Sequence, residues 1–442
     1  MNEARKEKDK RRRVSNLKWI VGALVLLILA YASASGFVVY SLYAVLLIMI
    51  LSRLTVEVCL RGLDVRRELS RTETVIGDKL EVTLTVRNTG GLPIPWVLVE
   101  ELLPGKMPVT GERARLFTLG PHKEKKMVYQ IVLNRRGYHR IGPALLEAGD
   151  LFGFFRRYKT LAAADYVTVF PAVEHIMEFD IAARRPMGTV KVTNKIFEDP
   201  TKIIGVREYV PGDPFNRIHW KTTARTGTLY SKVYEPSKVL GATFILDFHR
   251  SGYRGMQGHE RGELAVTTVA SLADYITGAN EQVGLVTNGR DLAEVARYEA
   301  QPLLGKIRRQ IVSTASASEK PRSLAPLIIP TRKSAEQGRL MLETLARLDY
   351  TDGLTIDKAL EYSIQRLGRD SATLVVAPEL TDALALSLGI LKEAGYLVSL
   401  FIIQNEPGYF EAVDKMASRF IDVYHIRGFA DVEKFATQDV YY

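Results

Sequence analysis

The sequence is poor in cysteine and lacks the marks of a secreted domain. Cys59 is the only cysteine among 442 residues, and no Asn-x-Ser/Thr glycosylation site occurs. Secreted domains often carry paired cysteines and such sites, so these absences exclude a small disulfide-stapled scaffold and favour an intracellular location.

Motifs that carry common enzyme chemistry are also missing. The chain has no Gly-x-x-x-x-Gly-Lys-Ser/Thr phosphate loop, no His-Glu-x-x-His zinc helix and no Gly-x-Ser-x-Gly nucleophile elbow. The first absence argues against an ATPase motor in this chain, so any energy input would have to come from a separate partner. The last argues against serine hydrolase chemistry.

Positive charge is concentrated beside an apolar run. The formal net charge is +10, and residues 1–13 alone hold seven basic and three acidic side chains. Because this cluster adjoins an apolar stretch, membrane topology explains it better than nucleic acid does, and we expect no nucleic-acid partner.

Residues 19–51 contain no charged side chain. As one helix these 33 residues would be about 50 Å long, whereas the hydrocarbon core of a bilayer is about 30 Å thick. The small residues at 33–36 suit a turn between two apolar halves, 19–32 and 37–51. We therefore expect a hairpin of two transmembrane helices; one long tilted span and a signal peptide are the alternatives.

Basic residues flank both sides of this run. Seven lie before it, and Arg53, Arg61, Arg66 and Arg67 follow it. Basic flanks stay in the cytoplasm, which predicts a multi-pass protein of the cell membrane with two helices and cytoplasmic soluble domains. A single span would instead place the soluble part outside the cell, as in a surface adhesin.

Residues 65–173 show a period of two. Val82, Leu84 and Val86 alternate with polar residues, and turn residues separate several such runs. This pattern predicts an antiparallel β-sandwich that serves as a spacer or docking module. The stretch at 135–138 and the aromatic cluster at 152–155 form either a binding surface or a core edge with a capped turn.

A dense polar segment at 207–227 combines turn residues with both signs of charge. Its alternation predicts a strand or extended latch in which Ile218 and Trp220 are buried. We expect either an ion-paired clamp between domains or a partner-binding surface, with catalysis by His219 and Asp213 as a third option. The candidate residues are Arg207, Glu208, Tyr209, Asp213, Arg217, His219, Trp220, Lys221 and Arg225.

This segment, with Asp199 upstream and Tyr234-Glu235 downstream, resembles the signature of the domain-of-unknown-function-58 family of prokaryotic proteins. The patterns at 136–138, 141–143 and 150–153 resemble it too. The resemblance implies a membrane hairpin, a sandwich and a C-terminal von Willebrand factor A-like domain. Members are commonly encoded beside MoxR-type AAA+ ATPases and transglutaminase-like membrane proteins, which implies assembly or chaperone-like work.

The C-terminal part alternates short apolar runs with helix-like stretches. Strands are expected at 243–246, 283–286, 372–377 and 396–403, and helices at 260–279, 340–348, 356–367 and 381–394. This order predicts a doubly wound, Rossmann-like α/β domain with a parallel sheet. Ligands of such sheets bind at the carboxyl ends of the strands, where Asp247, Thr287 and Pro378-Glu379 fall.

The family resemblance also implies a metal site of the von Willebrand A type. Asp247 and Ser251 match its first loop, Thr355 matches its threonine, and Glu379 stands where an aspartate is expected. His249 replaces a serine of that loop, and an imidazole and a longer carboxylate both weaken a magnesium site. Two outcomes are therefore open: a magnesium ion on these ligands, or a vestigial site in which His249 and Arg250 pair with Asp247 or Glu379.

These patterns together predict a membrane-anchored multidomain protein. The expected order is a basic N-terminus at 1–16, the transmembrane hairpin at 17–53, the sandwich at 54–175, a linker with the polar segment at 176–238 and the α/β domain at 239–442. A further mobile linker is expected at 306–330, because Ser, Ala, Lys, Arg and Pro dominate it.

The expected function is that of a non-catalytic interaction or assembly factor without a cofactor. Its partners would be a MoxR-type ATPase and other membrane proteins. The first alternative is a metal-assisted hydrolase that uses Asp247 and Glu379 with His219 or His249. The second is the adhesin that a single span would imply.

Overall fold

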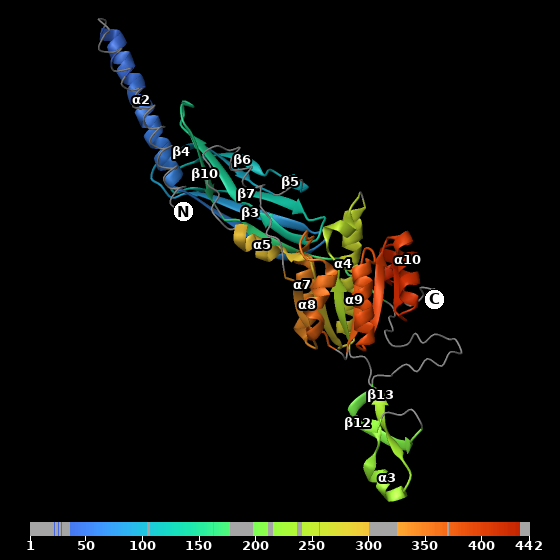
Figure 1. The fold of residues 1–442 in the computed structure, drawn as a ribbon. Coiled ribbons are helices and arrows are strands. Elements are labelled where there is room, and N and C mark those ends of the chain that lie inside the picture. The colour runs from blue at the N-terminus through green and yellow to red at the C-terminus, as the bar shows by residue number, and fades with distance from the viewer. Residues whose placement is uncertain are drawn as a thin grey trace. The chain divides into compact units, whose positions relative to one another are not determined.

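The computed structural model describes residues 22, 25, 28, 36–103, 107–161, 163–176, 198–210, 215–236, 241–255, 257–299, 325–368 and 371–433 (Figure 1). The chain forms two compact units. The first contains Met1–Asn134 and His139–Val167, and the second contains Arg135–Tyr138, Thr168–Tyr298 and Lys320–Tyr442.

The apolar helix α2 (Gly36–Arg61) directly precedes the first strand. Within it Val39–Arg61 is long and apolar enough to cross a membrane, with a mean hydropathy of 2.0. This supports association with a membrane. Gly22, Val25 and Ile28 are helical, but the rest of the expected first half of the hairpin and its turn lie outside the described residues.

Helix α2 continues beyond the expected end of the hairpin at residue 53. Its last turns bury Ser52, Val56, Cys59 and Leu60. These residues are spaced four, three and one apart, so they share one face of the helix. On the surface, Arg61 pairs with Glu57 at 3.3 Å. The charged residues therefore extend the helix as a half-buried element instead of ending it.

The β-rich part is built mainly from antiparallel strands in sandwich-like sheets. In β3, Val82, Leu84 and Val86 are fully buried, which confirms the predicted alternation. The sheet orders are β1-β3-β7-β5, β10-β9-β4-β6 and β2-β11-β8. The strands are β1 (Leu63–Leu69), β2 (Glu73–Val75), β3 (Lys79–Asn88), β4 (Ile94–Glu101), β5 (Val109–Gly111), β6 (Ala114–Leu119), β7 (Glu124–Val132), β8 (Gly137–Ile141), β9 (Ala144–Gly149), β10 (Arg156–Leu161) and β11 (Asp165–Phe170).

A buried ion pair lies inside this β-rich unit. Arg67 Nη2 is 2.6 Å from Glu101 Oε1, and Arg67 Nη1 is 2.8 Å from Asp165 Oδ2. Gly142 has a φ of +89°, and a Cβ there would collide with the Arg67 guanidinium. The Ile-Gly-Pro pattern at 141–143 thus places a glycine where both the backbone conformation and the close approach of Arg67 require it.

The second unit contains a six-stranded sheet of order β17-β15-β14-β19-β20-β21. Its strands are parallel except for the edge strand β17, which pairs antiparallel with β15. The strands are β14 (Gly241–Leu246), β15 (Gln282–Thr287), β17 (Leu327–Arg332), β19 (Ala372–Ala377), β20 (Val398–Ile403) and β21 (Asp422–Ile426), and β16 (Arg290–Asp291) pairs with β18 (Leu348–Asp349).

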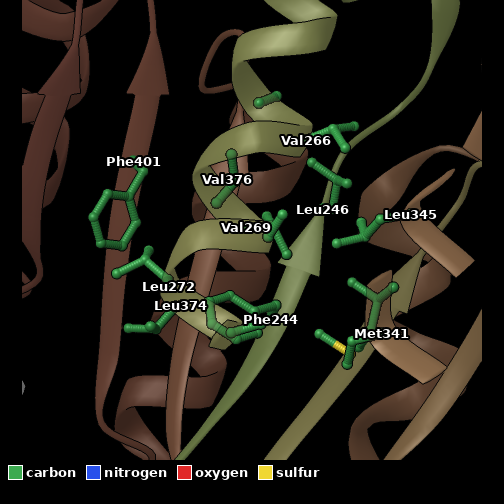
Figure 2. Close-up of a cluster of buried hydrophobic side chains, with 14 of the residues drawn as sticks. Phe244, Leu246, Val266, Val269, Leu272, Met341, Leu345, Leu374, Val376 and Phe401 are labelled. Atoms are coloured by element: carbon green, nitrogen blue, oxygen red, sulfur yellow. The ribbon is translucent and has the colours of Figure 1, made fainter. Parts of the chain in front are cut away.

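Helices cover both faces of this sheet. Phe244 and Leu246 of β14 pack with Val269 of α4 and Met341 of α7, as Figure 2 shows. Ile245, between them in β14, faces a second core with α8, α9 and α10. The helices are α4 (Gly258–Gly278), α5 (Leu292–Glu299), α7 (Ala335–Arg347), α8 (Ile356–Ser363), α9 (Asp382–Glu393), α10 (Glu406–Ala417) and α11 (Phe429–Glu433), with 3-10 turns η2 (Arg250–Tyr253) and η3 (Ile364–Arg366).

The predicted strands and helices of this unit are confirmed in type. The mobile linker expected at 306–330 ends earlier than predicted. Its last residues, 327–330, belong to strand β17, which pairs with β15. The part of that linker at 306–324 lies outside the described residues. Strand β21 and helices α5 and α10 are additional to the prediction.

Candidate functional site

The polar segment at 207–227 connects two strands of a small ladder and contains a helix. β12 (Glu198–Glu208) pairs antiparallel with β13 (Tyr230–Pro236). Between them lie a 3-10 turn, η1 (Phe215–Arg217), and α3 (Trp220–Thr226). Asp213 and the rest of 211–214 lie outside the described residues.

His219 begins helix α3. Its Nδ1 atom accepts the backbone N–H of Thr222 at 3.2 Å and lies 2.8 Å from the Thr222 hydroxyl. Gly227, with φ +77°, ends the helix by donating its N–H to the carbonyl of Thr223. The His219 ring therefore acts as a helix cap in the described structure.

The expectation that Trp220 is buried in an extended strand is wrong. Ile218 is 2% exposed, but Trp220 is 66% exposed. The alternation stops at His219 because the capped helix starts there, and a period of 3.6 then replaces the period of two. Histidine is not among the residues that commonly cap helices, so the sequence carries no clear signal of this cap.

An exposed aromatic pair lies on this segment. Phe215 is 76% exposed, and its ring stacks on that of Tyr209 with centroids 6.4 Å apart. The Trp220 ring is exposed as well. Sequence reasoning missed Phe215. Of the remaining candidates, Arg207, Glu208, Lys221 and Arg225 are exposed, whereas Arg217 and His219 are half-buried.

The other candidate residues lie at the carboxyl end of β14. Asp247 is buried, and its Oδ1 atom accepts the Asn288 side-chain amide at 2.8 Å and the N–H of His249 at 3.1 Å. Burial raises the pKa of Asp247, an effect that these hydrogen bonds offset only in part. Asn288 also accepts the N–H of Phe248 at 2.7 Å, so it fixes the whole loop. Sequence reasoning missed Asn288, although it follows a predicted strand.

Two loops at the carboxyl edge of the sheet, here called the rim, lie against each other: residues 247–251 after β14 and residues 351–355 before α8. Arg250 donates its N–H to the carbonyl of Thr351 at 2.9 Å, and Thr351 donates to the carbonyl of Phe248 at 3.1 Å. Ser251 Oγ lies 2.7 Å from His249 Nδ1, and Thr355 is the residue before helix α8.

A third loop joins them. A Cβ at Gly252 would collide with Pro378, so the loop that carries Glu379 approaches η2 closely. Of the vestigial alternative, the contact of His249 with Asp247 is present through the backbone N–H of His249, but the pairing of Arg250 with Asp247 or Glu379 is not. Arg250 instead pairs with Asp352 at 3.0 Å, because the 351–355 loop is its direct neighbour.

This donor set fits a magnesium ion poorly. Asp247 Oδ1 already accepts two N–H groups, and the Ser251 hydroxyl contacts the His249 ring. These contacts compete with a cation for the same oxygen lone pairs. Within the described part of the chain, no group of three or more His, Cys, Asp or Glu side chains is arranged to hold a metal ion.

Arg136, which the sequence placed either on a binding surface or at a core edge, is buried against the residues that support the Asp247 loop. Its Nη1 atom donates to the carbonyls of Leu345 at 3.0 Å and Leu348 at 2.8 Å. Its Nε atom pairs with Glu263 at 3.1 Å, and its guanidinium lies over the Phe248 ring. The Arg-Gly-Tyr pattern at 136–138 therefore belongs to the packing of the second unit.

The chain is similar to proteins without an assigned activity. Residues 205–323 match the family described as "Protein of unknown function DUF58". The chain is also 25% identical over 289 residues to "Uncharacterized protein YeaD" of Bacillus subtilis (strain 168), which covers 62% of this chain and 70% of that protein. Both matches support the resemblance to this family.

Among solved structures, the CARDB domain of the PF1109 protein from Pyrococcus furiosus, in complex with di-metal ions, is 20% identical with a TM-score of 0.19; the match covers 24% of this chain and 91% of that one. The PapD-like domain 7 of human CEP192 is 16% identical with a TM-score of 0.18, over 25% of this chain and 87% of that one. Scores of this size establish no shared fold.

Proposed function

We propose that this protein is a non-catalytic, membrane-tethered interaction or assembly factor. The observation that carries the proposal is the exposure of Phe215 and Trp220 in a segment that also carries both signs of charge. Large aromatic side chains are expensive to leave in water and dominate the energy of protein interfaces. Exposed Lys221 and Arg225 beside them provide a charged rim.

Helix α2 supports the membrane tether. Most of its apolar side chains, from Phe37 to Leu54, are exposed, which suits lipid better than water. We propose that residues 19–32 supply the other helix of a hairpin. The basic residues on both flanks favour a cytoplasmic location for both soluble units.

The partner we propose is a MoxR-type AAA+ ATPase, as the family resemblance implies. The match at residues 205–323 supports that resemblance, and it covers the segment that carries Phe215 and Trp220. A nucleotide-hydrolysing partner also suits a sequence without a phosphate loop. We propose that the α/β unit is of the von Willebrand A type and presents its Asp247 rim to proteins.

Co-purification from native membranes tests this function. The full chain and a Phe215→Ala, Trp220→Ala variant are compared by mass spectrometry of the proteins that travel with each. We expect at least a tenfold smaller recovery of the ATPase with the variant, because a desolvated aromatic anchor contributes about 2 kcal/mol or more.

The matched control is Tyr362→Ala, which removes an exposed ring from helix α8. It should retain the ATPase at the wild-type level. Equal recovery with all three proteins would exclude the Phe215 and Trp220 surface as the docking site. Asp247→Ala then measures the contribution of the rim separately.

A further inference from the structure

The turn at residues 151–154 exposes three large apolar side chains. It connects β9 to β10, and Leu151, Phe152 and Phe154 are 78%, 62% and 52% exposed. The two phenylalanine rings stack with centroids 6.0 Å apart. Large apolar side chains that gather on a soluble surface mark a contact with something other than water.

This turn is held in one conformation. The buried carboxylate of Asp150 accepts the N–H of Phe152 at 3.1 Å and of Phe155 at 2.7 Å. The Trp96 indole donates to the Asp150 carbonyl at 3.0 Å. Burial raises the pKa of Asp150, but these N–H groups lower it more, so the net pKa is below its ordinary value. The apolar side chains are thus presented by a preformed scaffold.

The turn lies beside the apolar helix. The Ser52 hydroxyl of α2 donates to the Asp150 carboxylate, and Ser52 is buried. The same helix face packs on the sheet edge, where Lys159 of β10 donates to the Leu60 carbonyl at 2.9 Å. Figure 1 shows β10 beside the C-terminal end of α2. Ser52 is nine residues before Arg61, so this contact lies about 14 Å before the helix end.

The position of Ser52 along α2 matches the level of a membrane surface. The uncharged run of the sequence ends at Leu51, directly before Ser52, and the first charge is Arg53. A span leaves the hydrocarbon where its charged residues begin, and aromatic rings are enriched at that level. Arg156 lies over the Trp96 ring at 5.9 Å, and both Arg156 and Arg157 are exposed, so cations accompany the aromatic groups. Such cations suit anionic phospholipid headgroups.

We propose that the turn at residues 151–154 inserts into the bilayer at the boundary between headgroups and acyl chains, and so anchors the β-rich unit against the membrane. This inference rests on the proposed tether by α2. A second membrane contact beside the helix fixes the orientation of the unit relative to the bilayer. A protein partner would bind a surface of the same composition, but the hydrogen bond to Ser52 places this turn next to the membrane helix and favours lipid.

Depth-dependent fluorescence quenching tests the inference on the full chain. The protein is reconstituted in vesicles of phosphatidylcholine and phosphatidylglycerol at a ratio of about 3:1, which supply the anionic surface. Cys59→Ala removes the natural cysteine, and Phe152→Cys then takes an environment-sensitive fluorophore. We expect a blue shift and at least twofold quenching by lipids that carry a spin label near the headgroup.

Two further labelling sites separate the possible outcomes. Leu116→Cys in β6 is an exposed apolar position of the same unit and should not be quenched. Leu47→Cys reports on α2 and should be quenched by labels deeper in the bilayer. Quenching at position 47 without quenching at position 152 would overturn the anchor and leave the tether intact. No quenching at position 47 would overturn the tether and the anchor with it. A blue shift at position 152 only on addition of protein partners would assign the turn to a protein interface.

Discussion

The guanidinium of Arg136 lies 5.4 Å from the centre of the Phe248 ring. Phe248 follows Asp247 in sequence and stacks on Tyr350 with centroids 4.4 Å apart. The Tyr253 hydroxyl donates to the Asp247 carbonyl at 2.8 Å. Arg136 therefore acts on the candidate site through the aromatic cluster that supports the Asp247 backbone.

Replacing Arg136 should weaken the second unit. Arg136→Ala leaves Glu263 and the carbonyls of Leu345 and Leu348 without their buried donor. Breaking such a pair costs about 3 kcal/mol. We expect the free energy of local opening at the end of α7 to fall by about that amount in amide hydrogen exchange. Arg339→Ala removes an exposed pair with Glu343 and should change it by less than about 1 kcal/mol. Equal effects of the two variants would contradict this role.

Breaking the buried Arg67–Glu101 ion pair should destabilise the β-rich unit. Both side chains are almost fully buried, and burial raises the pKa of Glu101 even with Arg67 beside it. Arg67→Met should destabilise the unit by about 3 to 5 kcal/mol, because it leaves a buried acid uncompensated. Adding Glu101→Leu should recover most of that loss in denaturant unfolding. A double variant as unstable as the single one would show that the pair is not the cause.

Gly142→Ala should damage the same site for a steric reason. The positive φ alone costs an L-residue about 1 to 2 kcal/mol, and the new Cβ would also displace the Arg67 guanidinium. Gly77→Ala is the matched control, since Gly77 has a φ of +92° but nothing within 4 Å of its Cβ position. Thermal unfolding should show a larger loss for Gly142→Ala. Equal losses would mean that only backbone strain matters.

His425 should make the second unit less stable in mild acid. Burial lowers its pKa, with a further contribution from Arg427, and its ring stacks on that of Tyr409 at 4.6 Å. The folded state then binds fewer protons than the unfolded state below the ordinary histidine pKa of about 6.5, so stability falls as pH decreases through that value.

The variant His425→Phe keeps an aromatic ring for the stack and removes the titrating group. Its thermal midpoint should fall less than that of wild type between about pH 7 and pH 5. His122→Asn, which removes a histidine from an exposed turn of the other unit, should leave the wild-type dependence unchanged. The interpretation is wrong if His425→Phe and wild type lose stability in parallel.

The topology is tested by reporters fused after Tyr442. A hairpin with both flanks in the cytoplasm predicts a fluorescent green fluorescent protein fusion and an inactive alkaline phosphatase fusion. The opposite pair of results would place the soluble units outside the cell. A single span and the adhesin hypothesis would then replace the proposed function.

The types of most elements in the second unit were predictable from local pattern. The run at 372–377 is β19, and all six of its residues are buried. Helix α9 begins after Thr381, whose hydroxyl accepts the N–H of Leu384 as a cap. The same approach failed at Trp220, because a helix capped by His219 interrupts an alternation that looked continuous. A cap that involves only His219 and Thr222 leaves too short a pattern in the sequence to be recognised within the longer alternation.

The candidate site was predicted less completely than the fold. Asp247 was expected at the sheet edge, but Asn288 and Arg136, which fix its loop, were not. The exposed Phe215 and the contact of Asp150 with Ser52 were also missed. Each of these depends on what a side chain meets after folding.

By itself, the sequence determined the apolar helix, the alternating strands and the order of strands and helices in the α/β unit. These follow from the period and polarity of neighbouring residues, which decide which face of an element is buried. Only the tertiary structure decided that Asp247 binds Asn288 and that Arg136 reaches two carbonyls at the C-terminal end of α7. Those partners are 41 and more than 200 residues apart in the chain, and a local pattern states that a side chain is buried without stating which side chain it meets.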